Sequence, residues 1–303
     1  MELDDFTAFL AVVEHGGFRR AAGALYVSQP SLSRRVSRLE QEIGATLLHR
    51  TARGVRLTSQ GEILASGARR LISTLDEVRA ATSGNWSNTI VIACTAIATG
   101  RYLSDFLAEW IPRHPETRVR IVEDVPAAVR RRLAEDTCDL ALIAPPVERR
   151  FASLPIARAQ INALLPPAHR LSADTGPLRI DDLRDEPLLI NGDQYLSGRM
   201  LAAAAALAGV PLQVIFECTA GDTLAALVNA GIGIAVVSDA VYDRRFPLPA
   251  RALMDMSGVR IGFDLRIVWS RERRLNPLAY LFAEEFSVFA QAREQPPTAS
   301  APV

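Results

Sequence analysis

The segment that decides the fold lies near the N-terminus, at residues 9–61, and reads FLAVVEHGGFRRAAGALYVSQPSLSRRVSRLEQEIGATLLHRTARGVRLTSQG. Apolar residues recur in it with helical spacing, and turn residues interrupt the runs. The pattern predicts helices at about residues 3–15, 19–26 and 28–44. Ser28 would cap the third helix, Pro30 fits its first turn because no intrahelical N–H is required there, and Gly44 would end it.

A short hairpin is predicted after the third helix. Residues 47–50 and 55–57 have the composition of strands, and the turn between them, Thr51-Ala52-Arg53-Gly54, is tight and basic. Three helices followed by such a hairpin indicate a winged helix-turn-helix domain over residues 1–58, with the basic turn as the wing.

A longer helix is predicted next, at residues 59–86. Thr58 or Ser59 would cap it, with Ser59 and Glu62 spaced as a capping box. Apolar residues then repeat every seven positions, at Leu64, Leu71 and Val78. This repeat is typical of a coiled pair, so we expect a linker helix that joins two copies of the chain into a dimer. The alternative is a single helix packed on its own domain.

The third helix has one apolar and one polar, basic face, as a helix that reads the major groove of DNA requires. Small serines allow close approach, Gln29 can bond a base edge, and Arg34 and Arg38 can reach guanine or phosphate. Arg53 in the wing is placed for the minor groove or the backbone. The candidate DNA-binding residues are Ser28, Gln29, Pro30, Ser31, Ser33, Arg34, Arg38 and Arg53. For any single arginine, the alternative is a solvated surface charge.

Charge is unevenly distributed along the chain, although the formal net charge of the 303 residues is zero. Residues 19–70 hold ten arginines against three glutamates, which suits a partner rich in phosphate. No apolar run reaches the roughly 18 residues that cross a bilayer, and the acidic N-terminus is unlike a secretory signal. We therefore expect a cytoplasmic protein of two or three domains that binds double-stranded DNA and no membrane.

From Thr89 onward, strands alternate with helices, which indicates an α/β region with a parallel sheet. Strands are predicted at residues 89–94, 118–123, 139–143, 163–165, 187–190, 211–217, 233–237 and 264–269. Helices are predicted at residues 101–114, 127–136, 200–208, 223–230 and 277–292, the last of them capped by Asn276. The tail at residues 296–303 is rich in Pro, Ala and Ser and is predicted to be disordered.

These segments resemble the LysR-type transcriptional regulators of bacteria. Residues 9–61 resemble the DNA-binding module of that family, most specifically through Ala21-Ala22, Leu25, Ser28-Gln29-Pro30, Ser33-Arg34, Leu39-Glu40, Gly44, Leu47, Arg50, Leu57-Thr58 and Gly61. The C-terminal part resembles the effector-binding half more loosely, through FLAEWIPRHPETRVRIVED, DLALI, LLPPAHRL and LAALVNAGIGIAVV. The resemblance implies an α+β multidomain fold: a winged helix-turn-helix, a linker helix, and two α/β subdomains arranged as in periplasmic solute-binding proteins.

The same resemblance implies an effector-binding domain at residues 87–295. Subdomain I would take up about residues 87–160 and 264–295, and subdomain II about residues 161–263. A small-molecule effector would bind in the cleft between them and modulate promoter binding or activation. The regulator would act on DNA as a homodimer or homotetramer.

Polar residues that follow predicted strands are expected to face this cleft, where a helix N-terminus with hydroxyls is a natural anion site. The candidate effector-binding residues are Thr95, Ala96, Ile97, Thr99, Arg101, Pro126, Asn191, Asp193 and Thr219. Ile97 and Pro126 stand where several carboxylate-sensing relatives carry a hydroxyl. This favours a smaller or more apolar effector, with Arg101 or Asp193 supplying the polar contact. The alternative for each candidate is a strand-end or helix-cap residue.

The sequence offers little support for catalysis or a cofactor. The four histidines are scattered, and no nucleophile, metal or dinucleotide motif is present, so we expect neither an enzyme nor a metal site. Cys94, Cys138 and Cys218 are far apart and are expected to be buried thiols. Two other functions stay open: a thiol-based redox regulator that uses Cys94 and Cys218, and a ligand-binding or enzymatic α/β protein whose helical module serves association.

Overall fold

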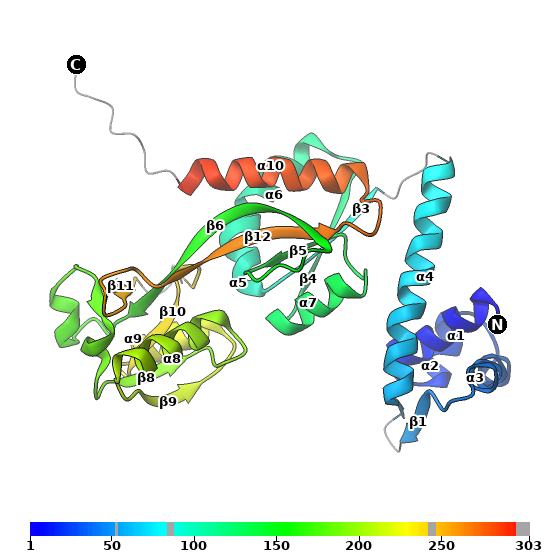
Figure 1. Cartoon of the computed structure of the whole chain (residues 1–303), viewed down its shortest axis with the longest axis horizontal. Helices are drawn as coiled ribbons and strands as arrows, with labels where there is room; N and C mark the ends of the chain where they lie inside the picture. Colours follow the sequence, from blue (N-terminus) through cyan, green and yellow to red (C-terminus); the bar gives the residue numbers. More distant parts are fainter. Residues whose placement is uncertain (52–53, 84–87, 242–246, 295–303) are drawn as a thin grey trace. The chain divides into compact units, whose positions relative to one another are not determined.

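The computed structural model describes residues 1–51, 54–83, 88–241 and 247–294 of the chain (Figure 1). The chain divides into two compact units, one formed by residues 1–87 with residues 134–137 and the other by the remainder. Each unit has its own hydrophobic core.

Short helices and a hairpin make up the first unit. Its elements are α1 (Leu3–Glu14), α2 (Phe18–Ala24), α3 (Gln29–Ile43), β1 (Leu48–Thr51), β2 (Gly54–Leu57) and α4 (Ser59–Ser83). Phe9, Leu32, Leu39 and Leu47 are fully buried in its core. The predicted helices, hairpin and linker helix are therefore all present, with small shifts at their ends.

Local capping signals set both ends of α3. The Oγ of Ser28 accepts a hydrogen bond from the backbone N–H of Ser31 at 3.3 Å. Gly44 ends the helix in the left-handed conformation, at φ +74°, where a residue with a Cβ is strained. Both signals confirm the prediction from the sequence.

Thr58, rather than Ser59, caps α4. Its Oγ1 accepts from the N–H of Gly61 at 2.9 Å and donates to the carbonyl of Thr46 at 2.7 Å. Ser59 is already the first helical residue, so the predicted capping box between Ser59 and Glu62 is wrong. A Cβ on Gly61 would lie 2.1 Å from the carbonyl oxygen of Leu47, so this close approach requires glycine.

One half of the second unit is a sheet covered by helices. Its elements are β3 (Thr89–Cys94), α5 (Ala96–Ala98), a π-helical turn (Thr99–Leu103), α6 (Ser104–Arg113), β4 (Arg118–Glu123), α7 (Pro126–Ala134), β5 (Leu140–Ile143), β12 (Gly262–Ser270) and α10 (Pro277–Glu294). Asn276 caps α10 as predicted, accepting from the N–H of Leu278 at 2.9 Å. The ring of Phe282 on α10 lies 5.1 Å from Phe106 and 5.0 Å from Trp110 on α6. The last helix, α10, therefore packs in the same core as β3, although the two are far apart in the sequence.

The other half is formed by most of the residues between β5 and β12, and it shares β6 with the first half. Its elements are β6 (Phe151–Leu164), β7 (Leu178–Arg179), β8 (Pro187–Ile190), α8 (Leu196–Ala208), β9 (Gln213–Glu217), α9 (Gly221–Asn229), β10 (Ile234–Ser238) and β11 (Ala250–Met254). Leu188, Leu201 and Val236 are fully or almost fully buried in a core that joins β8, α8 and β10. The two halves therefore have separate cores.

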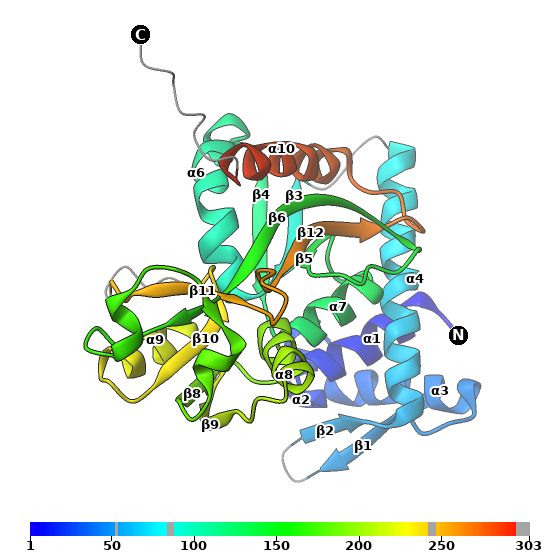
Figure 2. The same cartoon turned by 60° about the vertical axis from the view of Figure 1, so that its left-hand side comes forward.

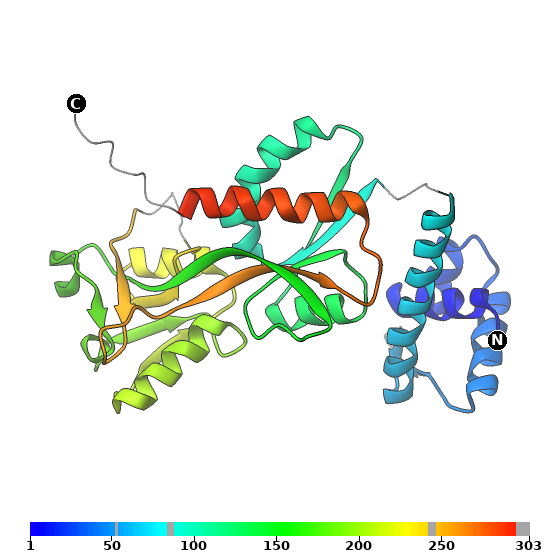
Figure 3. The same ribbon diagram turned by 45° about the horizontal axis from the view of Figure 1, so that its top comes forward.

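The strands of this unit pair in the order β4-β3-β5-β12-β6-β10-β8-β9, with β11 beside β6 and β7 beside β11. Within β6, residues 151–160 pair with β12 and residues 161–164 pair with β10, so one strand runs through both halves (Figures 2 and 3). The neighbours β3, β4 and β5 are parallel, as are β8, β9 and β10, whereas β6 and β12 are antiparallel to their partners. The predicted parallel sheet is therefore corrected to a mixed one.

Most of β6 is missing from the prediction, which placed a strand only at residues 163–165. Pro155 interrupts the strand signal because proline has no N–H to donate to a neighbouring strand. The pairing with β12 shifts register at this point, from Ala157 opposite Leu265 to Pro155 opposite Arg266. Ile156 is the extra residue of the irregularity, and a proline at such a bulge leaves the strand continuous.

Candidate functional site

The start of α3 borders a groove on the first unit, with a volume of about 500 Å³. Its lining includes Gln29, Pro30 and Ser33 of α3, Arg19 and Arg20 of α2, and Thr51 of β1. Three of the predicted DNA-binding residues therefore line the same groove as Arg19 and Arg20. From the sequence, these two arginines were counted only in the positive charge of residues 19–70.

The arginines of α3 differ in what they contact. Arg35 pairs with Asp4 at 2.8 Å, and Arg38 pairs with Asp5 and Glu2. Arg34 is exposed and makes no hydrogen bond or ion pair within the described part of the chain. The charge of Arg34 is therefore uncompensated by the described residues, whereas α1 and the residue before it compensate the charges of Arg35 and Arg38.

The contact between Arg38 and Asp5 fastens α3 to α1. Asp5 is fully buried. Burial alone would raise the pKa of its carboxyl, but the hydrogen bond from Arg38 and the N–H of Glu2 at 3.0 Å outweigh burial and hold this pKa below its ordinary value of 3.8. Arg38, predicted to bind DNA, is thus bound to a buried carboxylate of its own unit.

The remaining predicted DNA-binding residues have simple placements. Ser28 and Ser31 are joined by the cap of α3 and shape the start of that helix. Arg53 lies outside the described residues.

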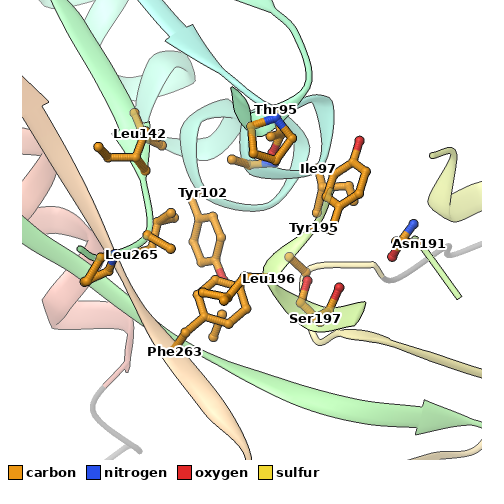
Figure 4. A pocket seen from close by; sticks show the side chains of 18 of the residues that line it. Thr95, Ile97, Tyr102, Leu142, Asn191, Tyr195, Leu196, Ser197, Phe263 and Leu265 are labelled. Carbon is orange, nitrogen blue, oxygen red and sulfur yellow. The ribbon is translucent and has the colours of Figure 1, made fainter. Parts of the chain in front are cut away.

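A cavity of about 110 Å³ lies between the two halves of the second unit (Figure 4). One half contributes residues that include Thr95, Ile97, Tyr102, Pro126 and Leu142, the other contributes residues that include Asn191, Tyr195, Leu196, Ser197 and Ser238, and Phe263 and Leu265 of β12 complete the lining. The lining combines apolar side chains with the hydroxyl groups of threonine, serine and tyrosine residues. A cavity of about 150 Å³ in another protein holds benzene, so this space suits a ligand of comparable size.

The nine residues predicted to bind an effector fall into three groups. Thr95, Ile97, Pro126 and Asn191 line the cavity. Ala96, Ile97, Arg101 and Thr219 line a wider neighbouring depression of about 950 Å³, together with Asp105, Asp222 and Asp239. Thr99 and Asp193 line neither of these two spaces.

An early helix start explains the positions of Thr99 and Arg101. Thr95 Oγ1 accepts a hydrogen bond from the N–H of Ala98 at 3.3 Å and caps α5. The helical stretch therefore begins at Ala96, whereas the sequence predicted a start at residue 101. Thr99 Oγ1 lies 3.1 Å from the buried Sγ of Cys94. Arg101 is therefore inside the helical stretch rather than at its N-terminus.

The sequence missed two arginines that line the cavity, Arg130 and Arg199. Arg199 belongs to α8, which begins at Leu196 rather than at residue 200 as predicted. Arg130 follows Pro126 by four residues on α7, and residues with that spacing share a helix face. Since Pro126 was already a candidate, this spacing is the signal that identifies Arg130.

Cys94 is buried, whereas Cys218 is half-buried. Burial raises the pKa of Cys94 to about 11, so its thiol is protonated at neutral pH. Cys218 is half-buried and donates to the carbonyl of Ala220 at 3.3 Å. Redox-sensing thiols have a low pKa and are accessible, and Cys94 has neither property. This disfavours the redox alternative.

Two further classes of feature are not found in the described residues. No group of three or more His, Cys, Asp or Glu side chains there could hold a metal ion. None of the helices in those residues is both long and apolar enough to cross a bilayer.

Two family models match the chain. Residues 3–62 match the bacterial regulatory helix-turn-helix protein, lysR family, and residues 83–289 match the LysR substrate binding domain. Together they extend from α1 to α10.

Named relatives cover most of the chain. The HTH-type transcriptional regulator AlsR of Bacillus subtilis (strain 168) is 29% identical over 246 residues, which are 78% of this chain and 80% of that protein. The HTH-type transcriptional regulator XapR of Escherichia coli (strain K12) is 29% identical over 282 residues, covering 91% and 94%. A full-length OxyR variant from Pseudomonas aeruginosa is similar in structure, with a TM-score of 0.73 and 20% identity over 96% of this chain and 97% of that one. CbnR, a LysR family transcriptional regulator, gives a TM-score of 0.67 at 20% identity over 96% and 99%.

Proposed function

Because the chain belongs to the LysR family of bacterial transcriptional regulators, we propose that α3 and the hairpin bind promoter DNA under the control of an effector in the cavity of the second unit. The effector is a small molecule, and it alters either DNA binding or the activation that follows. We propose that this action takes place in the bacterial cytoplasm, where the chromosome lies, and that it involves no enzymatic step.

The observation that carries effector control is a cavity lined by residues from both halves of the second unit. A ligand in it contacts the two halves at once and stabilises the arrangement in which both contacts form. Such a ligand also raises the stability of the domain by mass action. Thr95, Ile97, Pro126 and Asn191 are the predicted residues that we assign to this site.

The charge pattern of α3 supports DNA binding. Arg34 is uncompensated, and Gln29 and Ser33 lie on the same helix beside Arg19 and Arg20. We assign the reading of base edges to Gln29, Ser33 and Arg34, and phosphate contacts to the two arginines of α2, because phosphate contacts give affinity and base contacts give sequence preference.

Exposed apolar residues of α4 support self-association. Leu71 is 46% exposed and Val78 is 56% exposed, whereas Leu64 packs against the core of the first unit. Leu71 and Val78 lie seven residues apart on the helix, as in a coiled pair. We propose that a second copy of the chain covers them, giving a dimer or a tetramer built from dimers.

The purified chain tests this function directly. Nuclease protection of the DNA upstream of its own gene should show sequence-selective binding that weakens as salt rises. Compounds that raise the unfolding temperature should also change DNA binding or the protected pattern. A chain that shows no sequence selectivity at any salt concentration would contradict the proposal and favour a ligand-binding protein with a helical association module.

A further inference from the structure

Two arginines line the cavity, one from each half of the second unit. Arg130 is on α7 and Arg199 is on α8. No aspartate or glutamate belongs to the lining that the structure describes. The neighbouring depression differs, because it combines Arg101 with three aspartates. The cavity is therefore a positive site beside a surface that is mainly negative.

Backbone carbonyls hold Arg130 in place without compensating its charge. Its Nη1 donates to the carbonyl of Pro146 at 2.9 Å, and its Nη2 donates to the carbonyl of Ala144. Burial lowers the pKa of Arg130, and the positive charge of Arg199 lowers it further. Glu148 acts in the opposite direction, but its carboxylate is bound by Arg150 at 2.9 Å. The surroundings of Arg130 therefore disfavour its charged form.

Arg199 is held in a similar way and leaves one edge free. Its Nη1 donates to the carbonyls of Asp193 at 2.8 Å and Gln194 at 3.4 Å. Its Nε and Nη2 form no hydrogen bond with any residue that the structure describes. This edge of a guanidinium is the one that binds a carboxylate through two parallel hydrogen bonds.

The N-terminus of α8, where Arg199 lies, adds the positive end of a helix dipole to the charge of the two arginines. Arg199 lies in the first turn, where the helix dipole is positive and repels a cation. No side chain caps this turn, and its first residues, Leu196 and Ser197, line the cavity. The lining of one cavity thus includes two arginines and the first residues of a helix, and no aspartate or glutamate of the described chain.

Building on the effector site proposed above, we infer that the effector is a small monocarboxylate with a compact apolar body, bound through its carboxylate between Arg130 and Arg199. The apolar body contacts Ile97, Phe263 and Leu265. A volume of about 110 Å³ limits that body to about the size of a benzene ring. The sequence had favoured a more apolar effector, because residues 97 and 126 lack hydroxyls, but the two arginines supply the polar contact instead.

This site also gives a reason for the effector to act on both halves. Arg130 and Arg199 carry like charges on the two halves, and without an anion their repulsion opposes the approach of one half to the other. A carboxylate between them replaces that repulsion with attraction to both walls. The anion therefore favours a closed arrangement, and each arginine depends on the other for its effect.

Matched acids and amides test the charge requirement. Benzoate is compared with benzamide, and butyrate with butyramide, by thermal unfolding and calorimetric titration of the full-length chain. The acids should raise the unfolding temperature and the amides should not. Inorganic phosphate, which has charge but no apolar body, should act more weakly than the acids. An equal response to acid and amide, no response to either acid, or an equal response to phosphate would overturn the inference.

Charge-removing variants test the two residues. Arg130→Gln and Arg199→Gln keep hydrogen-bond donors but lose the charge, and each should weaken acid binding about tenfold or more. The matched control is Arg131→Gln, an exposed arginine of α7 outside the cavity lining, which should bind acids as the wild type does. Wild-type acid affinity in either cavity variant would overturn the assignment of that arginine.

DNA-binding measurements on the wild type and the three variants distinguish a failure of this inference from a failure of the proposed function. Ligand-free DNA binding should be unchanged in all three variants. A neutral or cationic compound that alters DNA binding regardless of the two arginines would preserve effector control and overturn only the anionic class. Absence of selective DNA binding would overturn the regulator function while leaving any difference between acid and amide intact.

Discussion

Arg34, Arg35 and Arg38 stand close together on α3, but the structure gives them different partners. Arg35 and Arg38 are compensated by Asp4 and Asp5, and Arg34 has no partner in the described part of the chain. Sequence periodicity can place all three on the solvent side of the helix, but it cannot show which acids of α1 come within reach. A basic, solvent-facing side of α3 could thus be predicted from the sequence, whereas the ion pairs of its arginines could not.

Arg34→Ala should weaken binding to the specific site by about 1–3 kcal/mol, because a guanidinium that reads a base edge contributes about that much to discrimination. Non-specific DNA should lose less affinity. Fluorescence anisotropy with specific and scrambled duplexes measures both, and Arg35→Ala, which removes a compensated charge, is the control. An equal loss on both duplexes would make Arg34 a phosphate anchor.

Asp5→Asn should destabilise the chain, and the loss should depend on pH. The pKa of Asp5 in the folded chain is lowered from 3.8, so its contribution to stability is present above about pH 3.8 and is lost as the pH falls through the folded value. Urea unfolding should therefore separate variant from wild type at pH 7 and bring them together under acidic conditions. Asp4→Asn, which breaks only an exposed pair, should have little effect at either pH.

At the scale of elements, a helix end or strand could be predicted from the sequence where residues close to it in the chain determine it. The ends of α3 follow from Ser28 and Gly44, and the start of α10 follows from Asn276, all of which act within a few residues. By contrast, β6 continues past Pro155 because β12 accommodates a register shift there. That partner lies about a hundred residues away in the sequence, so no local pattern could reveal the strand.

Gly61→Ala should destabilise the first unit by about 1–3 kcal/mol, because the new methyl group would overlap the carbonyl oxygen of Leu47. Gly67→Ala is the matched control on the same helix. A Cβ at residue 67 meets nothing within 4 Å, and alanine is the better helix former, so this variant should gain about 0.5–1 kcal/mol. Thermal or urea unfolding compares the two, and equal effects would contradict the close packing at Gly61.

Leu71→Asp should dissociate the proposed dimer, because it places a charge in an apolar contact between two α4 helices. Operator affinity should fall with dimerisation, since one half-site binds weakly. Analytical ultracentrifugation measures the mass, and Leu71→Met, which keeps an apolar side chain, should stay associated. An unchanged mass for the aspartate variant would contradict association through this helix.

At the scale of the molecule, the sequence indicated a DNA-binding module followed by an α/β effector region, and the structure and family matches bear this out. The chemistry of the cavity was only partly predictable. Thr95 and Asn191 follow strands and were found by that rule, and the spacing of Arg130 from Pro126 could have identified Arg130. Arg199 was missed because α8 begins four residues earlier than predicted, at Leu196.

The late return of α10 to the core of the first half constrains how the chain is made on the ribosome. Phe106 and Trp110 are synthesised long before Phe282 and Phe286, which pack with them in the same core. At roughly 5–20 residues per second, the nascent chain holds this aromatic cluster incomplete for many seconds. The winged helix-turn-helix can fold during that time, whereas the effector region exposes apolar surface that a chaperone can bind until α10 has been synthesised.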